Sequence, residues 1–120
     1  MTAPSKRKGD DAERQAVELL ASLGIDAYRL FGAGQTNDVG DLVSRNGALL
    51  VQVRNWQDVG RACFDGADAA QRQALAHPSA AVGVALVRRR GGRWAVTMTP
   101  HTMAYLLHAA GIVTVIHDAS

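Results

Sequence analysis

Hydrophobic and polar positions follow two different periods along this chain, and these periods predict a series of helices and strands. Residues 10–23 carry apolar side chains at spacings of three and four, with acids in the first turn that favour the helix dipole. Gly24 follows the last periodic position and is a typical stop signal, so the pattern predicts an amphipathic helix over 10–23. The stretch 25–31 alternates well enough for a strand, and 32–38 predicts a Gly-rich loop.

The rest of the chain continues to switch between the two periods. Its patterns predict strands over 39–45 and 48–54, an Ala-rich helix over 61–76, and strands over 80–88 and 93–98. A further helix is predicted to begin at Pro100, with Thr99 as its N-cap. A last short strand over 112–117 is optional. The predicted order is α-β-β-β-α-β-β-α, which is typical of a mixed α/β domain.

The Asn-Gly dipeptide at 46–47 predicts a tight hairpin between two of these strands, because it suits the positive φ angles of a type I′ turn. If these residues are the centre of the turn, the numbers of cross-strand partners sum to 93. Asp41 then lies opposite Gln52, and Val39 lies opposite Arg54. Since side chains two apart on a strand share a face, Asp41, Gln52 and Arg54 are expected to cluster on one side of the hairpin.

Composition limits the size and class of the protein. Its 120 residues suffice for one core, and 48% hydrophobic with 20% charged residues is ordinary for a globular protein. We expect a flexible basic segment at 1–9 and a single domain over 10–120. Cys63 is the only cysteine, which excludes a disulfide framework within the chain.

The longest clean apolar run, 80–87, is far shorter than the roughly 20 residues of a bilayer span, and no signal peptide pattern opens the chain. We therefore expect a cytoplasmic protein without a membrane partner. Association with the nucleoid, or a phage-encoded intracellular protein, stays open.

Positive charge is unevenly distributed, although the formal net charge is only +2. Seven of the thirteen Lys and Arg residues lie in 6–8 and 88–93. Such patches suit a polyanion such as nucleic acid. The alternative is a solvated terminus and a solvated hairpin tip.

The polar residues of the hairpin are of the types that cut a phosphodiester with a divalent cation. Such a reaction needs oxygen ligands, an activated water and a positive group near the phosphate. Asp41 offers a carboxylate, and Gln52 and the backbone of Val53 offer carbonyl oxygens. Arg54 offers the positive group, and Glu13 would add a second carboxylate if its helix packs across the hairpin. The alternative is an ordinary Asp41–Arg54 ion pair beside a solvated Gln52.

Four segments, in this order, resemble the archaeal-type Holliday junction resolvases of the PD-(D/E)XK nuclease superfamily. A basic, Gly-containing lead into a helix with an Ala-Glu-Arg signature is similar to RKGDDAER at 7–14, and a strand ending in Arg before a Gly-rich loop is similar to AYRLFGAG at 27–34. An aspartate at a strand start is matched by VGDLV at 39–43, and the strand with acid-x-lysine falls on VQVRN at 51–55. The resemblance covers about residues 6–108 and implies a restriction-endonuclease-like mixed β-sheet flanked by helices.

The same resemblance implies a metal site with two substitutions. Glu13 and Asp41 become metal-site carboxylates, Gln52 occupies the acid position, and Arg54 occupies the lysine position. Gln52 keeps an oxygen ligand but removes a negative charge, so the cation is held more weakly. Arg54 keeps the positive charge but does not deprotonate, so it cannot act as a general base. The proline of the aspartate motif is Gly40 here.

The resemblance also implies contacts with DNA. The residues expected to hold phosphates are Lys6, Arg7, Lys8, Arg29 and Thr36, with ordinary solvated side chains as the alternative for each. A glutamine of the second helix, Gln71 or Gln73, would reach the water at the metal site unless it faces solvent. The arginines of 88–93 would grip a distant arm of a branched substrate, or merely keep a hairpin tip soluble.

These features predict a Mg²⁺-dependent endodeoxyribonuclease, with Mn²⁺ as a substitute, that cleaves branched DNA such as the four-way junctions of DNA recombination. Because two nicks on opposed strands need two sites, the resemblance also implies a homodimer. The main alternative is a catalytically weak or inactive DNA-binding module that keeps the nuclease fold, for example a recombination or packaging accessory. A small α/β interaction domain is the third hypothesis.

Overall fold

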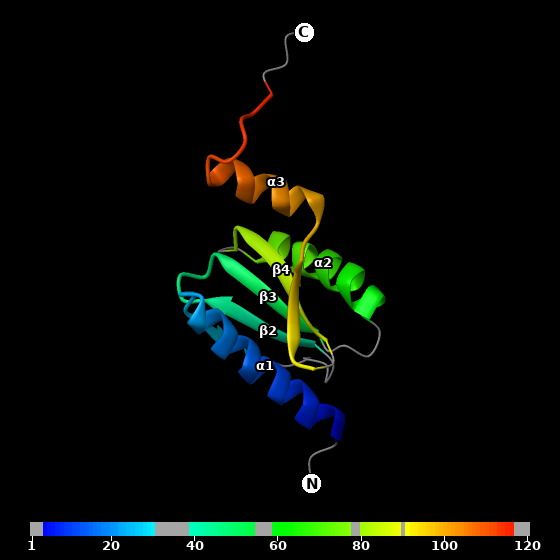
Figure 1. Cartoon of the computed structure of the whole chain (residues 1–120). Helices are drawn as coiled ribbons and strands as arrows, with labels where there is room; N and C mark the ends of the chain where they lie inside the picture. Colours follow the sequence, from blue (N-terminus) through cyan, green and yellow to red (C-terminus); the bar gives the residue numbers. More distant parts are fainter. Residues whose placement is uncertain (1–3, 31–38, 55–58, 78–79, 90, 117–120) are drawn as a thin grey trace.

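The computed structural model describes residues 4–30, 39–54, 59–77, 80–89 and 91–116, whose helices and strands build a mixed sheet with helices on both faces (Figure 1). In chain order the elements are α1 (Pro4–Ser22), β1 (Ala27–Arg29), β2 (Val39–Ser44), β3 (Leu49–Arg54), α2 (Val59–Ala76), β4 (Val82–Arg89), β5 (Arg93–Thr97) and α3 (Pro100–Ala109). The predicted order of helices and strands is confirmed.

The strands lie in the order β1-β2-β3-β4-β5. Strands β1, β2 and β3 are antiparallel neighbours, β3 and β4 are parallel, and β5 returns antiparallel to β4. A parallel pair needs a crossover connection, which α2 supplies. Strands β3 and β4 are buried over most of their length because helices cover both faces.

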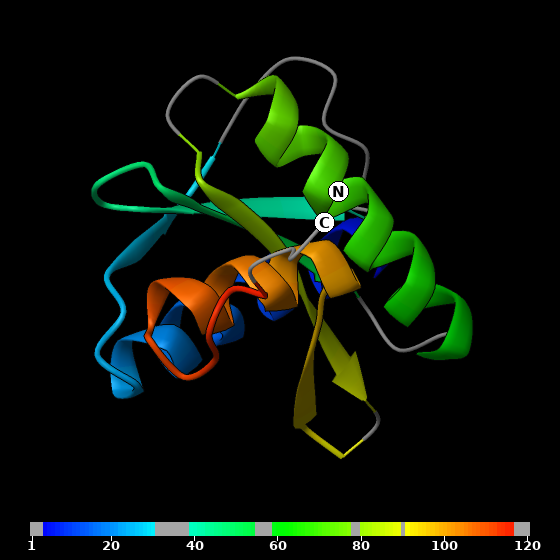
Figure 2. The same ribbon diagram turned by 90° about the horizontal axis from the view of Figure 1, so that it is seen from above.

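The two faces of the sheet are covered by different helices (Figure 2). On one face the apolar stripe of α1 packs on alternate residues of the strands; this core contains Ala12, Ala16, Leu20, Ala27, Leu42, Val51, Val53, Val84 and Leu86. On the other face Ala74 of α2 packs with Val43 and Leu50. The residues of β3 that alternate with this core therefore lie beneath α2.

Helix α2 lies very close to β4 because two glycines lack a Cβ atom at the contact. A Cβ atom on Gly83 would lie 2.6 Å from the carbonyl carbon of Ala70. A Cβ atom on Gly66 would lie 2.8 Å from the Cβ atom of Ala85. Gly66 weakens the intrinsic propensity of its helix, and this close packing is the reason that glycine fits there.

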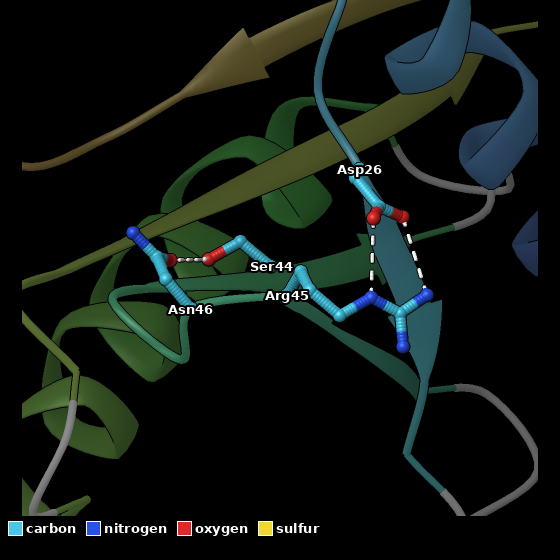
Figure 3. Close-up of polar contacts among 4 residues, drawn as sticks. All are labelled: Asp26, Ser44, Arg45 and Asn46. Atoms are coloured by element: carbon cyan, nitrogen blue, oxygen red, sulfur yellow. Dashed lines mark hydrogen bonds and ion pairs between the residues drawn. The ribbon is translucent and has the colours of Figure 1, made fainter.

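The loop between β2 and β3 spans the four residues 45–48 rather than the predicted two-residue turn. Only Gly47 has a positive φ, 80°, and its N–H donates to the carbonyl of Ser44. The hydroxyl of Ser44 donates to Oδ1 of Asn46 at 2.7 Å (Figure 3), and the N–H of Ala48 donates to the same oxygen at 3.1 Å. The type I′ prediction is wrong, but the predicted register is correct because the four-residue loop has the same two central residues.

Arg45 ties this loop to the start of β1. Its Nε and Nη2 donate to the carboxylate of Asp26 at 3.1 and 3.3 Å (Figure 3). Its guanidinium also lies 4.9 Å from the centre of the Tyr28 ring. The hydrogen bond to Asp26 and the charge of that carboxylate raise the pKa of Arg45 above its ordinary value. The β2–β3 loop is therefore anchored at the end of the sheet where β3 begins.

The ends of the chain compare with the sequence predictions in three places. Helix α1 begins at Pro4, so residues 4–9, predicted as part of a flexible basic segment, are helical. Helix α3 begins as predicted: Thr99 is its N-cap, and its Oγ1 accepts the N–H of Thr102 at 3.2 Å. Residues 112–116 form no strand, so the optional last strand is wrong over the part of it that the structure describes.

Candidate functional site

One row of residues crosses the sheet on the face that α2 covers. The strand register aligns Asp41 of β2 with Gln52 of β3, Ala85 of β4 and Thr97 of β5. Arg54 stands two residues beyond Gln52 and therefore shares its face. Both pairings that the sequence predicted for this hairpin, Asp41 with Gln52 and Val39 with Arg54, are confirmed. We call this face of β2 and β3, from Asp41 and Gln52 to Arg54, the candidate site.

Gln52 is buried, and only one of its two side-chain polar atoms has a hydrogen-bond partner among the residues that the structure describes. Gln52 is only 5% exposed, so the alternative of a solvated glutamine is wrong. Its Nε2 donates to Oε1 of Gln73 on α2, one of the two glutamines that the resemblance singled out. Its Oε1 is buried and accepts no hydrogen bond within the described part of the chain. An unsatisfied buried acceptor costs roughly 1–3 kcal/mol, so this oxygen would be stabilised by a cation or an added donor.

Arg54 passes beneath α2 at the point where Gly66 leaves space. A Cβ atom on Gly66 would lie 3.3 Å from Cγ of Arg54. The Nε of Arg54 is buried and donates to no acceptor among the described residues. Gln52 and Arg54 therefore present an unpaired acceptor and an unpaired donor on one face, about 7 Å apart along β3.

Glu13 does not lie with these residues. Its carboxylate accepts a hydrogen bond from Nε of Arg29 at 2.5 Å, and the two side chains are 12% and 27% exposed. Arg29 is aligned with Leu42, a member of the core beneath α1, so this ion pair lies on the opposite face of the sheet from Gln52. The expected second carboxylate is therefore not brought to the candidate site, because α1 crosses the hairpin on its other side.

The same ion pair changes the expectation for Arg29. A phosphate ligand and an exposed, solvated base were the two alternatives, and the structure shows a part-buried cation that is paired with Glu13. Removing either partner would leave a charge that is largely shielded from water, which is unfavourable.

Val53 lies between the two polar residues of β3, with its side chain in the core beneath α1. Its backbone is aligned with Gly40 on one side and with Leu86 on the other. A carbonyl oxygen keeps a second lone pair when it accepts one ladder hydrogen bond, so this position stays compatible with the expected role as a backbone oxygen ligand.

Metal binding at this site would depend on few charges. Among the described side chains, no three His, Cys, Asp or Glu residues are arranged to hold a metal ion. Among the described side chains on the α2 face, the amide oxygen of Gln52 and the hydroxyl of Thr97 are buried without a hydrogen-bond partner. The side chain of Asp41 is not among the described ones. Because Glu13 lies on the opposite face, the candidate site lacks one of the two carboxylates that the resemblance implies.

Several predicted contacts fall outside the described part of the structure. Thr36 lies outside the described residues, and the side chains of Lys6, Arg7, Lys8 and Asp41 are likewise outside them, although their backbones belong to α1 and β2. The alternative of an ordinary Asp41–Arg54 ion pair depends on one of these side chains and stays a prediction.

Thr97 was not predicted from the sequence. Its Oγ1 is buried without a partner among the described residues, and it stands in the same row as Gln52. It is separated from Gln52 by β4, or roughly 10 Å across the sheet. No local motif marks this threonine, and only the strand register brings it to this face.

Comparison of the chain with protein-family models, with curated proteins and with solved structures found no match. Within the described ranges, no helix has both the length and the apolar character that crossing a membrane requires.

Proposed function

We propose that this chain has a restriction-endonuclease-like fold and cleaves branched DNA with a divalent cation, Mg²⁺ or in its place Mn²⁺. The observation that carries the proposal is the buried Oε1 of Gln52, which has no partner in the described part of the chain and lies one strand from Asp41. The order of elements and the motif order that resembles the Holliday junction resolvases also support it.

The residues fit a hard cation in kind. Magnesium prefers oxygen ligands, and Asp41, Oε1 of Gln52 and the carbonyl of Val53 would supply them. Because Nε2 of Gln52 donates to Gln73, the side-chain amide is oriented with its oxygen free to accept a cation. When bound, the cation would polarise the phosphate and lower the pKa of a water molecule.

Arg54 has the role of a fixed positive charge in this proposal. An arginine side chain cannot serve as a general base, so Arg54 would act through its charge and not by taking a proton from the attacking water. Its Nε, buried and without a described acceptor, would stabilise the negative charge that develops on the phosphate. The narrow space beneath Gly66 holds the arginine stem in place.

A second candidate function is a DNA-binding module that keeps the fold with weak or no cleavage. The observation that favours it is the position of Glu13, which is paired with Arg29 on the other face. With glutamine in the acid position, the α2 face then carries fewer negative charges than the resemblance implies, which would weaken cation binding. This protein would still bind the phosphates of branched DNA.

The test is an incubation of end-labelled four-way junction DNA with the purified protein in Mg²⁺ or Mn²⁺. We expect nicking by the wild type, loss of nicking with Asp41→Ala, and unchanged nicking with Glu18→Gln, an exposed charge on α1. Junction binding without nicking in either metal would refute the enzyme and leave the binding module. Loss of binding as well would refute both functions.

Two further variants test the composition of the site. Gln52→Glu combined with Arg54→Lys should increase cleavage, because it adds a charged ligand and a smaller cation. Glu13→Gln should keep cleavage if Glu13 is outside the site, whereas loss of cleavage by a folded variant would support the role that the resemblance implies.

The proposal includes a homodimer, because paired nicks need two sites. Exposed large apolar side chains on and after α3 support a contact surface there; they are Met103, Tyr105, Ile112, Val115 and Ile116. Sedimentation velocity should show a dimer that Ile112→Asp with Ile116→Asp converts to a monomer. A wild-type monomer at working concentration would refute this part of the proposal.

A further inference from the structure

Two arginines at the tip of the β4–β5 hairpin lie on the same face of the sheet as the candidate site. Arg89 and Arg93 are direct cross-strand partners. Arg89 follows Val87 by two residues, and Val87 is aligned with Arg54. Because residues two apart on a strand share a face, Arg54, Arg89 and Arg93 all project on the α2 face.

The neighbouring arginine confirms this division of the hairpin. Nη1 of Arg88 donates to the side chain of Gln15 on α1 at 3.1 Å. Its cross-strand partner, Trp94, packs against the core beneath α1. Arg88 therefore belongs to the α1 face, and its alternation with Arg89 places the latter on the opposite face.

The fold itself makes no use of Arg89 and Arg93. Both are exposed, and the side chain of neither forms an ion pair or hydrogen bond with a residue in the described ranges. Like charges directly opposite on antiparallel strands, with Cα atoms about 4.5–5.5 Å apart, destabilise a hairpin. A phosphate between the two guanidinium groups would remove that repulsion and accept forked hydrogen bonds from each.

The position of this pair relative to Arg54 fits a continuous phosphate backbone. Arg89 lies two residues further along and one strand across, which corresponds to about 8 Å between Cα atoms, and Arg93 lies about 12 Å from Arg54. Neighbouring phosphates of a strand lie further apart in space than the roughly 3.4 Å rise per nucleotide along the helix axis, so these distances correspond to about one or two nucleotides. The hairpin projects from the body of the molecule, where a strand can reach it (Figure 2).

Helix α2 adds to the positive potential at this end of the sheet. Gly66 lies over Arg54 and Ala85, whereas Ala70 lies over Gly83, so α2 runs antiparallel to β4. Its first residue, Val59, therefore lies toward the end of β4 that carries Arg89. The N-terminus of a helix carries a partial positive charge that favours anions.

We infer that Arg89 and Arg93 form a phosphate-binding subsite that holds a DNA strand about one or two nucleotides from the phosphate at Arg54. This inference rests on the proposed function for the position of the first phosphate. It replaces the expectation that these arginines grip a distant arm of the substrate, since they lie at the same end and on the same face as the candidate site.

The first experiment measures binding of a fluorescein-labelled four-way junction by anisotropy, with Ca²⁺ in place of Mg²⁺, over a range of salt concentrations. Arg89→Gln with Arg93→Gln should weaken binding roughly 10- to 100-fold and lower the salt slope by about 0.9, because the contact with one phosphate is lost. The matched control, Arg14→Gln with Arg72→Gln, removes the same charge from exposed positions away from this subsite and should change binding less than about threefold. Equal losses in the two double variants would overturn the inference.

The second experiment locates the phosphate. Single neutral methylphosphonates are placed along one strand of the junction, and their effect on binding is compared for the wild type, Arg54→Gln and the Arg89→Gln/Arg93→Gln variant. We expect the effect of one methylphosphonate to vanish in Arg54→Gln, and that of another, about one or two nucleotides away, to vanish in the double variant. If the methylphosphonate effect vanishes at the same phosphate in both variants, or at no phosphate in either, the subsite is overturned.

These measurements separate the subsite from the nuclease proposal. If the effect of one phosphate depends selectively on Arg89 and Arg93, but the protein does not cleave in Mg²⁺ or Mn²⁺, the subsite is supported and the enzyme is refuted. If the wild type cleaves the junction but the Arg89→Gln/Arg93→Gln variant binds it no more weakly than the control variant does, the enzyme is supported and the subsite is overturned. Absence of any junction binding would overturn both.

Discussion

Replacing Gly83 with alanine tests how closely α2 approaches β4, on which the geometry of the candidate site depends. The added Cβ atom would lie 2.6 Å from the carbonyl carbon of Ala70 and 3.1 Å from Cβ of Ala74. Carbon atoms in contact normally lie about 3.5–4.0 Å apart, so α2 would have to move by about 1 Å. Neither neighbour is a flexible side chain that could rotate away.

Two opposing contributions set the size of the effect. An extra methyl group in a packed interface typically costs about 1–3 kcal/mol, with the upper end expected where backbone must move. Alanine in a strand regains roughly 0.5–1 kcal/mol relative to glycine. We therefore expect Gly83→Ala to lower the free energy of unfolding by about 2 kcal/mol, or the thermal midpoint by roughly 6–10 °C for a domain of this size.

The assay is urea and thermal unfolding followed by far-UV circular dichroism, with junction cleavage measured on the folded variant. Gly66→Ala is the matched control on the same interface: its contact with Ala85 is 2.8 Å, and a helix gains about 1 kcal/mol from alanine, so its net loss should be smaller. Cleavage should also fall in Gly83→Ala, because movement of α2 separates Gln73 from Gln52. A Gly83→Ala variant as stable as the wild type would refute the close packing.

Other predictions concern the cap, the site and the hairpin. Thr99→Ala removes the acceptor of the Thr102 N–H and should cost about 1 kcal/mol in urea unfolding, whereas Thr99→Ser should cost less; equal costs would contradict the capping role. Gln52→Glu puts a carboxylate where the side chain is 5% exposed, and burial raises its pKa above that in the unfolded chain. Without metal, its thermal midpoint should therefore fall as pH rises above about 4.3, and Mn²⁺ should restore it; a midpoint indifferent to both would argue against a cation site. Arg89→Gln with Arg93→Gln should leave the thermal midpoint unchanged or slightly higher, and a clear decrease would show that these arginines are structural.

The separation of Glu13 from Gln52 bears most directly on the choice between an enzyme and a binding module. A nuclease cation site is stabilised by the negative charges that face it, and the candidate site has glutamine where an acid is expected. Within the candidate site, Gln52 has one amide oxygen that is buried without a partner among the described residues. Under the proposed function, cleavage would therefore depend on the carboxylate of Asp41, which the junction assay tests.

Local interactions explain what the sequence alone determined. The hydrophobic periods predicted the order of elements, and Thr99 with Pro100 predicted the start of α3, because helix caps and amphipathic faces depend on residues within a few positions of one another. The register of Asp41 with Gln52 was also predictable. It follows from the centre of the β2–β3 loop, even though the turn type was wrong.

Long-range packing decided the rest. A helical period shows which side of α1 is apolar, but not which face of the sheet it covers, and that choice separated Glu13 from Gln52. The contact of Gln52 with Gln73 and the space beneath Gly66 depend on how α2 crosses the sheet. Likewise, only the parallel pairing of β3 with β4 brings Arg89 to the same end as the candidate site, because strand direction is set by partners distant in sequence.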